Sequence, residues 1–391
     1  MIKFISFFFI FVITLSNAQS KTQYVSENAN NEELAYALGT TLEESIQNDE
    51  PQQFLKQWHT DSFKEQIRKE MKLEEVTPYY KGFLEGVTKG LSGFPNKLIA
   101  EYNADAYYDF IGLRYEKLEQ TYYALFRFYS ESEGINYHDY KLCLVDGKFM
   151  FSDVYIYLTG EHFSATVGRL GILALPKNKL AEVFGMDSSR KDYGFLQDAI
   201  KLAKKGSFEK AYKSLLKVKG DLKDDKFFLL LKSQYAMSFD MDAYNASIED
   251  LMETFPYDST LNILYIDYYT ALEKYEKAMG YIDQLEEETK DDFLRLMKAH
   301  LYYTMDNTEK AMENYEFIIE NYAFFEAYSA KLTLLTHSEQ FDDAIELLDE
   351  LAQDYEKSDL IEYIEEKDEN GENILEALVK SKAYKTWKKS K

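Results

Sequence analysis

Cysteine and proline are scarce in this chain of 391 residues, which contains one cysteine and five prolines. A single cysteine excludes an intramolecular disulfide, so packing alone must stabilise the folded chain. Cys143 lies in an alternating apolar segment, residues 141–145, where a free thiol usually behaves as a small buried hydrophobe. We therefore expect Cys143 to be buried and to have no role as a nucleophile.

Basic residues are also fewer than acidic residues. The chain has 45 lysines and arginines against 69 aspartates and glutamates, which is a formal net charge of −24. Nucleic acids and anionic lipid surfaces carry charge of the same sign and are repelled. The composition therefore disfavours nucleic acid as a partner, whereas the 46% of hydrophobic residues predicts a folded chain.

Catalytic signatures are absent from the sequence. It contains no phosphate-binding loop, no nucleophile elbow, no metalloprotease helix motif and no pair of metal-ligand spacings. We expect no catalytic residues, no metal and no cofactor, and we favour a binding protein over an enzyme.

One apolar run stands out, at residues 4–15. Lys3 precedes it, and the small residues Ser16 and Ala18 occupy the −3 and −1 positions of a cleavage site. The run is shorter than the roughly 20 residues that span a bilayer, and no stop-transfer pattern follows it. Residues 1–18 are therefore predicted to be a signal peptide rather than a retained anchor, which implies export to the periplasm or the medium and no transmembrane anchor after cleavage.

A short pattern recurs in the second half of the chain, an aromatic or polar residue followed three positions later by a small one. It occurs at residues 208–211 (FEKA), 244–247 (YNAS), 275–278 (YEKA), 308–311 (TEKA) and 341–344 (FDDA). The first residues of these segments are 36, 31, 33 and 33 positions apart. After the small residue, apolar side chains follow at +4 and +7, as in Ile282 and Leu285, which predicts one buried helical face.

This repeat resembles the tetratricopeptide family, whose period is about 34 residues and whose unit is a pair of helices. The resemblance covers residues 192–356 in about five units, and residues 357–391 are expected to form capping helices. The family's Trp and Gly are missing from the first helices, and the second unit departs from the register near Phe239. An all-α helical solenoid is the expected fold.

The resemblance implies that the first helix of each unit lines a concave surface that binds another protein. Counting by the family pattern places nine residues there, called the groove set below: Lys204, Ile263, Asp267, Met297, His300, Tyr303, Thr304, Thr333 and His337. The regular lysine and asparagine clamp with which related repeats hold a C-terminal carboxylate is not present at matching positions. Binding of chaperone tails is therefore not implied.

The first half is predicted to be an α+β domain over residues 19–160. Helical patterns run from Glu32 to Lys72 and from Pro78, and alternating strand patterns follow. Asp146 and Gly147 predict a two-residue type I′ hairpin that pairs Leu144 with Phe149 and Cys143 with Met150. Helices followed by an antiparallel curved sheet resemble NTF2-like (cystatin-like) domains. Residues 161–191 are expected to connect this domain to the repeats.

Five polar or aromatic residues of the strands are candidates for a ligand pocket, called the sheet set below: His138, Tyr140, Asp153, Tyr155 and His162. Extending the hairpin register would place His138 opposite Tyr155, on the face that also carries Asp153. A histidine beside an aspartate can act as a general base with its orienting group. A hydrogen-bonded histidine without a catalytic role is the more frequent outcome on a tyrosine-rich strand.

The sequence thus favours a non-catalytic, exported scaffold or adaptor that binds envelope or secreted proteins through the concave face of the repeats. One alternative is small-ligand binding or hydrolysis in the N-terminal domain. Another is a structural component of an outer-membrane assembly, for which the sequence offers no anchor.

The signal peptide makes a direct prediction. Protein recovered after export should begin at Gln19, because cleavage follows Ala18. Edman degradation or mass spectrometry of the exported protein checks this, and an N-terminus at Met1 would exclude a cleaved signal peptide.

Overall fold

The computed structural model describes residues 25–71, 78–131, 134–175, 189–368 and 370–390. The predicted signal peptide and its cleavage site lie outside these residues, as does part of the expected connector. The chain divides into two compact units, Met1–Ser247 and Ile248–Lys391, and the division falls within the expected repeat region. No helix among the described residues is long and apolar enough to cross a membrane.

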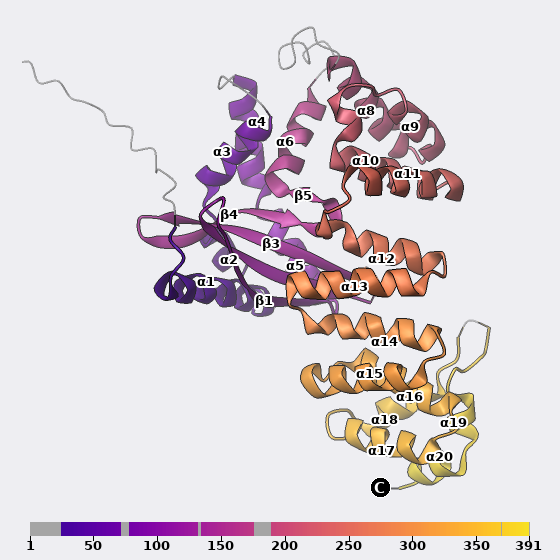
Figure 1. The fold of residues 1–391 in the computed structure, drawn as a ribbon. Helices are drawn as coiled ribbons and strands as arrows, with labels where there is room; N and C mark the ends of the chain where they lie inside the picture. Colours follow the sequence, from indigo (N-terminus) through magenta and orange to yellow (C-terminus); the bar gives the residue numbers. More distant parts are fainter. Residues whose placement is uncertain (1–24, 72–77, 132–133, 176–188, 369, 391) are drawn as a thin grey trace, which may run out of the picture. The chain divides into compact units, whose positions relative to one another are not determined.

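The first unit begins with helices, continues with a sheet and ends with further helices (Figure 1). The helices before the sheet are α1 (Ala29–Gln47), α2 (Pro51–Lys56), α3 (Thr60–Glu70), α4 (Pro78–Gly90) and α5 (Gly93–Tyr102). The strands are β1 (Tyr107–Glu116), β2 (Thr121–Ser130), β3 (Gly134–Val145), β4 (Lys148–Ile156) and β5 (Glu161–His162). The helices after the sheet are α6 (Phe163–Ala174), α8 (Ser189–Ala203), α9 (Phe208–Leu215), α10 (Lys226–Met237) and α11 (Met241–Thr254), the last of which crosses the division.

Local signals explain where the first helices begin. The side chain of Asn28 accepts a hydrogen bond from the backbone N–H of Asn31 and so caps α1. Pro51 occupies the first turn of α2, where its missing N–H is no loss. The helical patterns predicted between Glu32 and Lys72 and from Pro78 are confirmed.

The strands form one antiparallel meander in the order β1-β2-β3-β4-β5. Asp146 and Gly147 both have positive φ, 49° and 78°, as a type I′ turn requires. The predicted pairs Leu144–Phe149 and Cys143–Met150 are confirmed.

Beyond this hairpin the predicted register is wrong. Lys141 pairs with Asp153 but Leu142 pairs with Phe151, so Ser152 is an extra residue in β4. Such a β-bulge shifts every later pair by one residue. His138 consequently pairs with Ile156 rather than with Tyr155.

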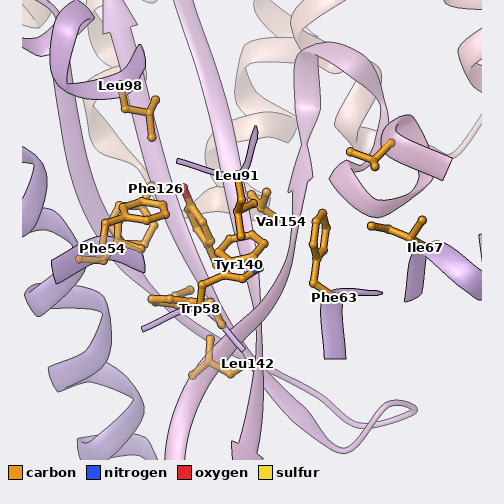
Figure 2. Packing of buried hydrophobic residues seen from close by; sticks show 14 of the residues in the cluster. Phe54, Trp58, Phe63, Ile67, Leu91, Leu98, Phe126, Tyr140, Leu142 and Val154 are labelled. Carbon is orange, nitrogen blue, oxygen red and sulfur yellow. The ribbon is translucent and has the colours of Figure 1, made fainter. Parts of the chain in front are cut away.

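The hydrophobic core of the first unit lies between the helices and one face of the sheet. Figure 2 shows aromatic side chains from both sides meeting there, with Trp58 and Phe63 of the helical side near Tyr140 of β3. The rings of Trp58 and Phe63 are 5.3 Å apart and meet edge to face, and those of Trp58 and Tyr140 are 6.2 Å apart. Aromatic packing of this kind supplies the stability that the absent disulfides cannot.

The described elements of the second unit are helical (Figure 1). The longer helices are α12 (Asn262–Ala271), α13 (Tyr275–Thr289), α14 (Arg295–Thr304), α15 (Thr308–Tyr322), α16 (Phe325–His337) and α17 (Phe341–Leu351). They are followed by α18 (Lys357–Glu365), α19 (Glu376–Lys380) and α20 (Lys382–Trp387). The predicted order of an α+β region followed by a mainly helical region is confirmed.

The turns between paired helices repeat. Glu273, Asp306 and Glu339 each have φ between 57° and 58° and each stand two residues before the second helix of a pair. Gly206, with φ of 71°, occupies the same place before α9. Side chains other than glycine rarely adopt this conformation, so its recurrence marks equivalent positions.

The second repeat requires a correction of register. Its second helix, α11, begins at Met241, three residues before the Tyr244 that the motif indicated. Asp240 accepts a hydrogen bond from the N–H of Ala243 at 2.9 Å, as Asn307 does from Lys310 before α15. Counting from Met241 places Tyr244 where the other units have alanine. The motif misled because Ser247, one helical turn further on, is also small.

The C-terminal helices are held by Trp387, which is buried. Its indole N–H donates to Asp349 at 2.7 Å, and the ammonium of Lys357 lies 4.4 Å from the centre of its ring. These contacts tie α20 to α17 and α18.

The four motif alanines, Ala211, Ala278, Ala311 and Ala344, are completely buried. We expect Ala278→Leu or Ala311→Leu to lower the free energy of unfolding by about 1–3 kcal/mol, because added methyl groups overpack a close crossing. Ala271→Leu, at an exposed helix end, is the matched control. Urea titration followed by circular dichroism measures all three, and equal stability of buried and exposed variants would contradict the packing assignment.

Candidate functional site

The bulge at Ser152 separates the sheet set onto two faces. His138 and Tyr140 lie on the helix-covered face, where Tyr140 belongs to the core. Asp153 and Tyr155 alternate with the core residue Val154 and lie on the opposite face. The predicted pocket uniting all five residues is therefore wrong, because one extra residue in β4 reverses the face of everything beyond it.

His138 is buried in a hydrogen-bonded tyrosine cluster. Its Nδ1 lies 3.0 Å from the hydroxyl of Tyr108, which lies 2.7 Å from the hydroxyl of Tyr140. Burial, aided by the charge of Lys97, lowers the pKa of His138 to about 4. The imidazole is therefore neutral at physiological pH and satisfies core hydroxyls, which is a structural role.

Asp153 is fully buried and is hydrogen-bonded to Ser164 in the first turn of α6. Its carboxylate accepts hydrogen bonds from the hydroxyl of Ser164 at 2.5 Å and from the backbone N–H of Ser164 at 3.1 Å. Burial nevertheless raises the pKa of Asp153 to about 7. The residue works as a helix cap supplied by a strand.

His162 lies beside this cap without a good hydrogen bond to it. Its Nδ1 is 3.7 Å from the carboxylate of Asp153, and burial lowers the pKa of His162 to about 4. A catalytic serine needs a histidine between itself and the carboxylate, but Ser164 donates directly to Asp153. The three residues therefore lack the geometry of a hydrolytic triad.

Tyr155 also has a structural role. Its hydroxyl donates to the carbonyl of Gly160 at 2.7 Å and accepts from the ammonium of Lys226 at 2.5 Å. Arg169 of α6 pairs with Glu161 at 2.9 Å. These bonds fasten β4 and β5 to α6 and α10 inside the first unit.

Sequence reasoning missed an ionic network on the face opposite the core. The guanidinium of Arg114 donates to Asp139 at 2.7 and 3.0 Å and lies 4.1 Å from the ring centre of Tyr123. Lys141 pairs with Glu119 at 2.5 Å. Alternating charges at positions 139 and 141 of one strand were the available signal, although the partners could not be assigned without the register.

Two further observations concern reactive and metal-binding groups. Cys143 is buried as predicted, and burial raises the pKa of its thiol to about 11, so it is protonated at neutral pH. Among the described residues, no group of three or more histidine, cysteine, aspartate or glutamate side chains is arranged to hold a metal ion.

The groove set in the second unit is partly assembled. The hydroxyl of Tyr303 on α14 lies 2.7 Å from Nδ1 of His337 on α16, and the two rings stack. His300 lies 3.7 Å from the carboxylate of Glu326, also on α16. The first helices of two successive pairs thus bring Tyr303 and His337 into contact, and His300 precedes Tyr303 by three residues on α14.

The other members differ in exposure. Asp267 and Thr304 are exposed, and Met297 and Thr333 are half-buried. Ile263 is buried, so its assignment to a binding surface is wrong: an isoleucine at this position packs in the interior. Lys204 is exposed but belongs to the first unit.

Comparison with known proteins adds no identification, because no family model and no curated protein matches the chain.

Asp153 makes a prediction about pH. A raised folded-state pKa means that the fold prefers the protonated carboxyl, so this contribution to stability is present below pH 3.8 and is lost as pH rises through about 7. Asp153→Asn mimics the neutral form. The variant should match the wild type near pH 4 and exceed its free energy of unfolding by at most about 4 kcal/mol at pH 8.

Urea titrations of both proteins from about pH 4 to pH 8 measure this difference. The lowered pKa values of His138 and His162 act in the opposite sense, since their contribution is lost as pH falls from 6.5 towards 4. Both proteins share that loss, so the difference between them isolates Asp153. A difference that does not change with pH would contradict the assignment.

Proposed function

We propose that the chain is an exported scaffold whose helical repeats form a tetratricopeptide-like solenoid that binds a cationic segment of a partner protein. The observation that carries this proposal is contact between residues one repeat apart. Tyr303 and His337, and likewise Ser329 and Tyr363, are hydrogen-bonded across 34 positions. That separation equals the period of the family, which stacks each unit against the next.

The exposed part of the first helices has the chemistry of a recognition surface. Tyr303 is 37% exposed although its hydroxyl is fixed by His337. Tyrosine is enriched among residues that dominate binding energies, because a rigid ring buries a large area at little entropic cost. The surface defined by His300, Tyr303, Thr304 and His337 is called the α14–α16 surface below.

The charge of the second unit indicates the kind of partner. Ile248–Lys391 contains 15 lysines and arginines against 35 aspartates and glutamates, a net charge of −20. Asp267 is exposed on α12, and Glu326 lies beside His300. Such a field attracts segments that carry lysine or arginine and speeds their association.

The alternatives find less support. A hydrolytic or ligand-binding function in the sheet of the first unit would need the sheet set to converge, and its members lie on two faces of the sheet. A role in an outer-membrane assembly has no feature of the described residues in its favour. Export follows from the signal-peptide pattern at residues 1–18 and is part of the proposal.

The α14–α16 surface can be tested by removing its side chains. His300→Ala combined with Tyr303→Ala should reduce capture of partner proteins from envelope extract by at least about tenfold, while the free energy of unfolding changes by about 0.5 kcal/mol or less. Quantitative mass spectrometry of the captured proteins and a urea titration provide the two readouts.

The matched control is Asn314→Ala combined with Asn321→Ala on α15. Both asparagines are neutral and donate only to carbonyls of their own helix. The control should capture partners at the wild-type level. A lysine-rich peptide should displace these partners, because it competes with their cationic segment for the α14–α16 surface. Undiminished capture by the His300/Tyr303 variant would refute the proposal, and severe unfolding of that variant would place both residues in the core.

A further inference from the structure

A lysine-lined hollow lies beside the helix pair α8 and α9 in the first unit. Its volume is about 490 Å³. Its lining is Asp198, Lys201, Leu202, Lys205, Lys210, Lys213, Ser214 and Lys217. The five lysines of this lining are called the lysine hollow below.

Helical geometry explains why these residues converge. On each side of the hollow the lining residues follow at +3, +4 and +7 from the first, Asp198 on α8 and Lys210 on α9, which is the spacing of one helical face. The last residue of each series, Lys205 or Lys217, lies in the turn just after its helix. The two faces meet because α8 and α9 pack against each other. Within the described part of the chain, Lys213 alone of the five forms an ion pair, with Glu209 at 2.5 Å.

The concentration of positive charge is local. Residues 190–232 contain twelve lysines and arginines against six aspartates and glutamates, a net charge of +6 in a chain whose total is −24. Lys201 and Lys205 are four positions apart across the end of α8, and Lys213 and Lys217 are four positions apart across the end of α9. Each pair brings like charges near one another, which is electrostatically unfavourable. An ordinary solvated face mixes charges of both signs, as this acidic chain easily could.

The other repeats do not share the feature. In the second helix of a pair, Lys213 and Lys217 stand five and nine positions after the first residue, Phe208. The equivalent residues of later pairs are Ala246 and Asp250 in α11, Gly280 and Gln284 in α13, Glu313 and Phe317 in α15, and Glu346 and Glu350 in α17. Packing between repeats therefore does not require lysine at these positions, and the lysines belong to the first pair alone.

The dimensions and charge define the ligand. The volume lies within the range of about 300–1,000 Å³ that is usual for small-molecule sites. Five ammonium groups and the carboxylate of Asp198 leave a lining charge of +4, which matches an anion of several charges. Lysine binds phosphate groups as a compact point charge. The net charge of −24 repels extended polyanions, so a small anion is favoured over nucleic acid or a lipid surface.

We propose that the lysine hollow binds a small multivalent oxyanion of the oligophosphate class. The site lies in the first unit and does not depend on the protein-binding function proposed for the second. Lys205 and Lys210, which come from different sides of the hollow, carry the proposal most directly.

The test is calorimetric titration of the full chain with sodium tripolyphosphate. We expect saturable binding near one equivalent per chain that weakens as sodium chloride is added. Lys205→Gln combined with Lys210→Gln should weaken binding by at least about tenfold, because glutamine keeps the aliphatic stem and removes the charge. The control, Lys191→Gln combined with Lys219→Gln, removes the same charge from exposed lysines of the same segment outside the lining.

The outcomes separate the explanations. Equal weakening in both double variants would mean a diffuse field and would overturn the site, as would the absence of saturable binding. Tighter binding of a poly-glutamate peptide than of tripolyphosphate would overturn the ligand class. In the last arm, vesicles containing a phosphomonoester lipid are the probe. Vesicle binding that tripolyphosphate displaces supports recognition of the phosphate group by the lysine hollow. Vesicle binding that tripolyphosphate does not displace contradicts the proposal.

Discussion

Burial of a small side chain at the same point of four second helices, α9, α13, α15 and α17, is the constraint on which the helical part depends. Ala211, Ala278, Ala311 and Ala344 have no exposed surface, and larger apolar residues one and two turns later are buried with them. A helix pair alone cannot cover such a face, so each must lie against a neighbour. Because the chain has one cysteine and no disulfide among its described residues, this packing has no covalent substitute.

The sequence predicted elements better than it predicted registers. Periodicity was sufficient to find the helix pairs, and the Asp146-Gly147 turn was sufficient to find the hairpin with its first pairs. The predicted strand register failed at Ser152, because an extra strand residue cannot be recognised in an alternating pattern. The predicted repeat register failed at Met241, because Tyr244 and Ser247 resemble the motif one helical turn too late. Each error is a shift of one residue or one turn, which alters every contact beyond it.

The same limit governed the candidate sites. His138 and Asp153 were candidates for a ligand pocket, and both are buried polar groups whose pKa values are displaced by burial. Their roles could not be inferred, because the partners Tyr108 and Ser164 are distant in sequence. A buried polar group that has all its hydrogen bonds stabilises one arrangement of the core, and only the list of partners distinguishes that from catalysis. The contact between Tyr303 and His337 is easier to anticipate, because a repeat period of about 34 residues makes residues one period apart neighbours.

Charge is distributed along the chain in a way that average composition conceals. The net charge of −20 over Ile248–Lys391 and of +6 over residues 190–232 would attract the corresponding regions of a second copy. At physiological ionic strength, screening over about 8 Å confines that attraction to direct contact. At direct contact, attraction is strong only where the two surfaces have complementary shapes. A hollow of about 490 Å³ can enclose a compact anion, whereas the convex surface of a helix does not fit into it. Opposite charges on one chain are therefore compatible with the two different ligands proposed for its two units.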